Sequence, residues 1–237
     1  MLTATFLVVS APVVAKDVPR PFSATYIGRP YVVGKLETVI TLERIGGHLK
    51  YTMSSKASAP FYRNEFYECS VMAVRGERLY PLEYKHTDTK DAAKNVSVRF
   101  DWDASAASVT RADGQQTRIT GLVWPVWDPL SLQVGIMTDL INGEFGTEKV
   151  YRLLERGVVN DRRLRRVVED GADTDTVSRE AVRVERADGG APRLWFAKEH
   201  GYIPVTIELK NIRVELTSEP PGATRNAASP NGEMPRC

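Results

Sequence analysis

Apolar and polar residues alternate along most of this chain, in short runs that turn-forming residues separate. The clearest run alternates four apolar side chains with polar ones: Val96, Val98, Phe100 and Trp102. A run over 36–42 and a returning run over 49–53 flank Gly46-Gly47. Because side chains of an extended segment point to opposite faces in turn, this period of two around a glycine pair predicts a β-hairpin. The chain therefore has to fold mainly as antiparallel sheet.

The second half of the chain continues the same pattern after one interruption. We expect strands at about 147–156, 162–169, 177–187, 193–198, 202–209 and 212–217. Many short strands with regular turns are typical of a sandwich, a barrel or a strongly curved sheet. Residues 20–217 are predicted to form one β-rich domain, and residues 218–237, rich in Pro, Gly, Ser and Asn, a disordered tail.

One segment breaks the alternation and predicts a helix. Asp128 is suited to cap it, Pro129 to occupy its first turn, and Asn142-Gly143 to end it. On a helical wheel one apolar stripe consists of Leu130, Val134, Met137 and Ile141. It is flanked by Leu132, Ile136 and Leu140. The apolar arc is wider than the ~100° stripe of a surface helix. We therefore expect the helix to lie on the concave face of a curved sheet, buried on more than one side.

Overall composition excludes some classes of function. The chain has 32 basic and 30 acidic residues, a formal net charge of +2, so no nucleic-acid partner is expected. No apolar run reaches the ~18 residues that a membrane-spanning helix requires. The segment from Leu2 to Val14 is apolar, and Val13 and Ala15 fit a signal-peptidase site, although no basic residue precedes Lys16. We favour an export signal over residues 1–15; the alternative is an apolar N-terminus without that role.

The two cysteines, Cys69 and Cys237, lie at neither disulfide-framework nor metal-ligand spacing. The sequence favours unpaired cysteines, because a bridge would have to draw the tail back onto the domain, but it does not decide the matter. No recognised catalytic motif is present, and no cofactor or metal is expected. Of the three histidines, His48 lies in a turn and His200 in a loop, whereas His86 follows Tyr84 on a strand and could point into a cavity.

A basic run is the first candidate for binding. It comprises Arg162, Arg163, Arg165 and Arg166, which would project to both faces of a strand. One interpretation is an edge strand that charge protects against aggregation. The other is a contact site for anionic headgroups at a membrane surface, or for a partner protein, because guanidinium groups bind phosphate in bidentate fashion.

An aromatic frame is the second candidate. Trp124, Trp127, Trp195, Phe196 and Tyr202 all lie near loops or ends of elements. They could pack as ordinary core, or they could line the mouth of a site for an apolar ligand with a polar end. The ligand-binding residues predicted from this frame and from the helix are Trp124, Trp127, Val134, Met137, Ile141, Trp195 and Tyr202.

The order and spacing of several weak motifs resemble a known family. They are an N-terminal "FSATYIG...GKLET" pair, "LYPLEYKHT", a D-P-x-S helix start at Asp128, and a C-terminal group at Trp195, Gly201-Tyr202 and Pro204-Val205. Over residues 22–210 the chain resembles the exported bacterial proteins of domain-of-unknown-function family 3108. One turn departs from the family, since residues 174–182 lack the proline and the glycine of its T-P-x-G-x-F turn.

The resemblance implies a periplasmic protein of a Gram-negative bacterium, with a half-open β-barrel in the style of lipoprotein carriers, but no activity. Pro204 lacks a backbone donor, so its strand is predicted to lie at an edge or to bend there. The loop between Trp195 and Tyr202 would then form the rim of an incompletely closed sheet.

Three functions remain open from the sequence. The favoured one is a non-enzymatic carrier of a lipid or other apolar ligand in envelope biogenesis. The second is an envelope scaffold that contacts another protein through its arginine run or an edge strand. The third is a hydrolase that uses paired carboxylates, a hypothesis that requires two such groups to face each other in a pocket.

Overall fold

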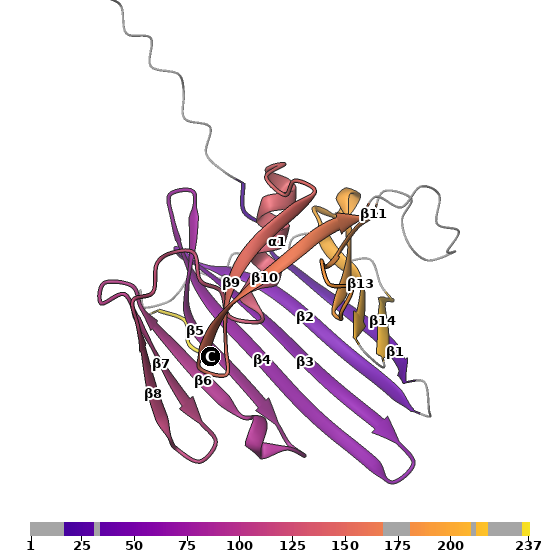
Figure 1. The fold of residues 1–237 in the computed structure, drawn as a ribbon. Coiled ribbons are helices and arrows are strands. Elements are labelled where there is room, and N and C mark those ends of the chain that lie inside the picture. The colour runs from indigo at the N-terminus through magenta and orange to yellow at the C-terminus, as the bar shows by residue number, and fades with distance from the viewer. Residues whose placement is uncertain (1–16, 31–33, 168–180, 210–211, 218–233) are drawn as a thin grey trace, which may run out of the picture.

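The computed structural model describes residues 17–30, 34–167, 181–209, 212–217 and 234–237. These residues form one antiparallel sheet of fourteen strands and one α-helix, α1 (Ser131–Ile141) (Figure 1). Eight strands precede the helix: β1 (Phe22–Pro30), β2 (Lys35–Ile45), β3 (His48–Ala59), β4 (Tyr62–Arg75), β5 (Arg78–Asp88), β6 (Val96–Asp101), β7 (Ala106–Arg111) and β8 (Gln116–Thr120). Six follow it: β9 (Glu148–Glu155), β10 (Val158–Val167), β11 (Ala181–Arg186), β12 (Arg193–Ala197), β13 (Ile203–Leu209) and β14 (Ile212–Leu216). The predicted signal segment lies outside the described residues.

The sheet is open, as the family resemblance implied. Its strand order runs from β8 back to β1, continues with β14 and runs back to β9. The pairing of β1 with β14, in which Gly28 lies opposite Val214, joins the two halves. The two end strands, β8 and β9, do not pair with each other, so the strongly curved sheet has a seam between them.

The segment between β8 and the helix spans this seam. The amide of Trp127 donates to the carbonyl of Arg152 at 2.9 Å, and the amide of Leu154 donates to the carbonyl of Trp127 at 2.8 Å. The guanidinium of Arg152 also donates to the carbonyl of Val123. Part of the edge of β9 is therefore paired with this segment, although no strand is added to the sheet there.

The helix lies within the curve of the sheet, as predicted (Figure 1). Every one of its residues is buried or half-buried, and Val134 and Met137 have no exposed surface. Two side-chain hydrogen bonds connect it to opposite parts of the sheet: Tyr51 on β3 donates to Gln133, and Tyr151 on β9 donates to Asp139. The helix has a wide apolar arc because the sheet covers it on several sides.

The strand order excludes the edge position that was one of two alternatives for the arginine run and for Pro204. The strand that carries the arginine run, β10, pairs with both β9 and β11, so it is not an edge strand. The strand of Pro204, β13, likewise lies between β12 and β14. The register instead shifts between Trp195 and Phe196, next to Pro204, which is the bend that a missing backbone donor favours.

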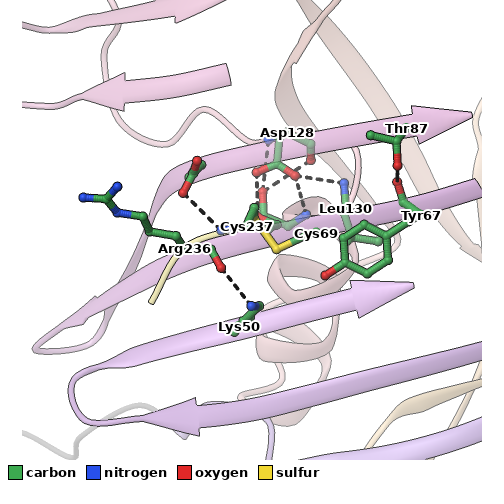
Figure 2. The surroundings of a disulfide bond; sticks show 11 residues. Lys50, Tyr67, Cys69, Thr87, Asp128, Leu130, Arg236 and Cys237 are labelled. Carbon is green, nitrogen blue, oxygen red and sulfur yellow. Dashed lines mark hydrogen bonds between the residues drawn. A yellow bond between two sulfur atoms is a disulfide. The ribbon is translucent and has the colours of Figure 1, made fainter. Parts of the chain in front are cut away.

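The last residues of the chain, Arg236 and Cys237, are bound to the sheet, which contradicts the prediction of a disordered tail for these positions. Cys237 forms a disulfide with Cys69 on β4, with a Cα–Cα distance of 5.6 Å (Figure 2). The side chain of Lys50 donates to the carbonyl of Arg236 at 2.8 Å, and the amide of Cys237 donates to Glu83 at 3.2 Å. The expectation of unpaired cysteines is therefore corrected. Residues 218–233 lie outside the described part.

Candidate functional site

A cavity of about 540 Å³ lies beside the seam. Its deeper wall is formed by Tyr84, Val96, Val98, Pro129 and Leu154, of which Tyr84, Val98 and Leu154 are buried. Its mouth is formed by Asp91, Ala93, Lys94, Arg111, Glu155 and Arg156. The volume falls within the range of 300–1,000 Å³ that is typical of small-molecule sites. We take this cavity as the candidate functional site.

The register of four neighbouring strands places part of the lining on one face. Glu68 on β4 lies opposite His86 on β5, His86 lies opposite Val96 on β6, and Val96 lies opposite Arg111 on β7. Residues directly opposite each other in an antiparallel pair project to the same side of the sheet. This row runs from the sheet interior, at Glu68, to the exposed end of β7 at Arg111.

Glu68 is the centre of a polar cluster in the wall of the cavity. One of its carboxylate oxygens lies 2.8 Å from His86 Nδ1 and accepts from the hydroxyl of Tyr84 at 3.2 Å. Burial raises the pKa of Tyr84 well above its ordinary value, and the charges of Glu68 and Asp128 raise it further. Tyr84 is therefore a neutral hydrogen-bond donor at physiological pH, and its ring adds apolar surface to the wall.

Asp128 lies in the interior between the sheet and the helix, with no exposed surface. Its carboxylate accepts from the amides of Leu130 and Ser131, at 3.0 and 2.8 Å, and from the hydroxyl of Ser70 on β4 at 2.8 Å. Burial raises its pKa from 3.8 to about 6, although these hydrogen bonds act in the opposite direction. The regular helix begins at Ser131, and Asp128 caps its first turn as the sequence predicted.

The charges at the mouth are only partly balanced. Lys94 pairs with Asp91 at 3.1 Å, and Glu155 pairs with Arg162 at 2.7 Å. Arg111 donates to two neutral acceptors, the side-chain oxygen of Gln115 at 2.8 Å and the carbonyl of Arg156 at 3.4 Å. Within the described part of the chain, neither Arg111 nor Arg156 has a carboxylate within 4.0 Å.

The residues predicted to bind a ligand do not line this cavity. Trp127, Val134 and Met137 pack into the main core, and Ile141 is half-buried. Ligand binding by these residues stays a prediction, but packing already covers Trp127, Val134 and Met137. The indole of Trp127 lies so close to Gly135 that a Cβ on that glycine would be 3.0 Å from the ring.

The aromatic frame is divided among separate places. Trp195 packs with Ala197 and Val205 on the face of the sheet opposite to Phe196, which lies in the main core. Tyr202 is half-buried against the main core. The loop between Trp195 and Tyr202 joins two interior strands and is not the rim of the seam, which corrects that prediction.

Trp124 belongs to a different aromatic group. Its ring lies 5.6 Å from that of Tyr80 and under the guanidinium of Arg78, and Trp102 packs against Tyr80 at 5.7 Å. Its indole nitrogen donates to the carbonyl of Leu79 at 2.9 Å. These contacts hold the group together, and no local pattern in the sequence indicated that Tyr80 and Trp102 would join it.

The arginine run is largely paired within the sheet. Arg163 lies 3.8 Å from Glu148, and Arg165 donates to the buried Glu185 through two nitrogens, at 2.8 and 2.6 Å. Arg162, as described, pairs with Glu155. Arg166 is exposed, without an ion pair among the described residues. Contact of the run with anionic headgroups or a partner protein stays a prediction. Of the four arginines, only Arg166 has no ion pair among the described residues and so could make that contact unopposed.

Most of the cavity was not identified from the sequence. His86 does point into a cavity, as its position after Tyr84 allowed. Glu68 lies 18 residues earlier, and Arg156 lies 45 residues after Arg111, so only the strand order brings them together. Tyr84 and His86 are two residues apart on a strand and so project to the same face, and this is the one local pattern that indicated this wall.

The described residues show neither a metal site nor a helix that could span a membrane. Among the described residues no group of three or more His, Cys, Asp or Glu side chains is arranged to hold a metal ion. In the same part of the chain, α1 and the two 3-10 turns are too short or too polar to cross a bilayer as helices.

Comparison with known proteins agrees with this fold. A family model described as "Protein of unknown function (DUF3108)" matches residues 22–214, which confirms the resemblance found in the sequence. A crystal structure of a β-barrel-like protein of domain-of-unknown-function family DUF1849, from Brucella abortus, superposes with a TM-score of 0.52 at 10% identity. The match covers 87% of this chain and 100% of that one. No protein with a curated description matches the chain.

Proposed function

The chain belongs to the DUF3108 family, and we propose that it is an exported, non-enzymatic protein that binds a lipid-like or other largely apolar molecule in the cavity beside the seam. The observation that carries the proposal is the gradient along the cavity, from buried Val98 and Leu154 to exposed Lys94 and Arg111 at the mouth. A molecule with an apolar body and a polar end fits such a gradient, because each end meets surface of its own polarity.

The disulfide supports an exported protein. Cys69 and Cys237 are the two cysteines of the chain, and they are paired. Disulfides persist in oxidising compartments such as the bacterial periplasm and are rare in the cytosol. We therefore propose a periplasmic location, with a role in envelope biogenesis.

The side chains in the cavity favour binding over catalysis. Its three carboxylates are each engaged: Glu68 with His86 and Tyr84, Asp91 with Lys94, and Glu155 with Arg162. A hydrolase of the carboxylate type needs a pair of carboxyl groups that flank the bond to be cleaved, whereas these three are directed at partners within the protein. The alternative of an envelope scaffold has less support, because three of the four arginines in its proposed contact surface are paired within the sheet.

The experiment compares two substitutions in the 3-10 turn η1 (Ala92–Lys94). Both Ala92 and Ala93 are exposed, but only Ala93 lines the cavity. The full chain is purified under mild conditions, and bound molecules are identified by native mass spectrometry, followed by titration with a fluorescent twelve-carbon fatty acid. We expect Ala93→Trp to block uptake and Ala92→Trp to leave it unchanged. Protein that carries no ligand and takes up no probe, or equal uptake by both variants, would overturn the proposal.

A further inference from the structure

We infer that the mouth of the cavity binds the anionic headgroup of a single-chain amphiphile through Arg111 and Arg156, an inference that rests on the proposed function. The two guanidinium groups come from opposite sides of the seam. Arg111 ends β7, and Arg156 lies in the turn between β9 and β10. The Arg111 guanidinium donates to the backbone carbonyl of Arg156 at 3.4 Å, and both residues line the cavity.

The charge around the cavity is the first reason. Each acidic side chain in the lining already has a basic or hydrogen-bonding partner, whereas Arg111 and Arg156 have no acidic partner within the described residues. Two like charges at one mouth repel each other, and an anion between them relieves that repulsion. Guanidinium groups bind carboxylates and phosphates through paired N–H donors, which makes either headgroup suitable.

The backbone of the turn is the second reason. Arg156 has a φ of 53° and Gly157 a φ of 84°, so both central residues of the hairpin turn have left-handed conformations. Such turns favour Asn-Gly or Gly-Gly, and a long side chain at the first position is disfavoured there. Strain of this kind tends to gather at functional positions. The residue that carries it here, Arg156, is part of the cavity lining.

The lining behind the mouth defines the rest of the ligand. Val96 continues inward from Arg111 in the same cross-strand row, and Val98 and Leu154 lie deeper, where they are almost inaccessible to solvent. An alkyl chain would lie along these residues while its head stays at the mouth. Glu68, paired with His86, would repel a second anionic group placed deeper.

The test uses three twelve-carbon probes of matched length, each below its micelle concentration: dodecanoate, dodecyl phosphate and the neutral monolauroylglycerol. Binding to the full chain is measured by isothermal titration calorimetry for the wild type, Arg111→Gln, Arg156→Gln and the double variant. Arg118→Gln is the matched control, because Arg118 is exposed on β8 and does not line the cavity. Thermal unfolding of every variant verifies that the fold is retained.

We expect the double variant to bind the two anionic probes about tenfold to a hundredfold more weakly, because charge-assisted hydrogen bonds are lost. Its affinity for the neutral probe and all affinities of Arg118→Gln should be unchanged. The ratio of dodecanoate to dodecyl phosphate affinity then tells which headgroup the site prefers. The inference fails, with the proposed function intact, if all three probes bind equally well and the double variant changes nothing. Failure of every probe to bind would overturn both.

Discussion

The buried carboxyl of Asp128 leads to a prediction in which stability rises when a charge is removed. Asp128→Asn keeps the size of the side chain and an oxygen that accepts from the amides of Leu130 and Ser131. Asparagine caps helices about as well as aspartate. The hydroxyl of Ser70, which donates to the second oxygen, can rotate to accept from the new amide group. The substitution thus mainly replaces an ionisable group with a neutral one.

The magnitude follows from the shifted pKa. Burial raises the pKa of Asp128 from 3.8 to about 6 in the folded protein. Between these values the folded state binds a proton that the unfolded state has released, so the contribution of this group to stability is greatest below about pH 4. It is lost as pH rises through about 6. The loss is about 3 kcal/mol, since each pKa unit corresponds to about 1.4 kcal/mol.

Urea unfolding followed by tryptophan fluorescence at pH 3.5, 5, 6 and 8 measures the effect. Asp128→Asn should match the wild type at pH 3.5 and exceed it at pH 8 by up to about 3 kcal/mol. Asp128→Ala is the control for the cap, and it should be less stable than Asp128→Asn at every pH, by about 1–2 kcal/mol. A difference between wild type and Asp128→Asn that does not depend on pH would refute the reasoning, as would a wild type that gains on the variant as pH rises.

Two further predictions concern how the sheet and the chain end are held. Gly28→Ala should lower the free energy of unfolding by at least about 1–3 kcal/mol, because its Cβ would lie 2.4 Å from the Val214 side chain and 2.9 Å from the carbonyl oxygen of Arg213. Gly47→Ala, where no atom lies within 4 Å, is the control, and equal denaturation midpoints for the two variants would contradict this. Cys237→Ser should cost about 2–5 kcal/mol, because the disulfide spans a sequence separation of 168 residues. Calorimetry without reductant measures this loss, and an unchanged melting temperature would show that the bridge contributes nothing.

Local structure in this protein could be predicted because it depends on neighbouring residues. The runs at 193–198, 202–209 and 212–217 correspond to β12, β13 and β14 within two residues at each end. The helix could be predicted for the same reason, since Asp128 and Ser131 are close in sequence and cap its first turn together.

Strand order could not be predicted, because it depends on contacts between distant segments. Pro204 lacks a donor, so its strand was expected to lie at an edge or to bend, and the sequence did not decide between the two; a register shift next to it lets β13 stay inside the sheet. The disulfide shows the same limit. The sequence just before Cys237 contains few apolar residues, so no local pattern indicates that Cys237 pairs with Cys69 in the core.

The wide apolar arc of the helix does not mark the position of the cavity. A wide apolar arc is expected of any helix that sheet surrounds, whether or not a ligand lies beside it, and Val134 and Met137 have no surface left for one. Free space instead remains beside the seam, where β8 and β9 do not pair and no strand closes the sheet. There the short side chains of Val96 and Val98 on β6 line the cavity, two strands from the end strand β8. A ligand site in a half-open barrel is therefore better sought in small residues near its unpaired strands than in the helix at its centre.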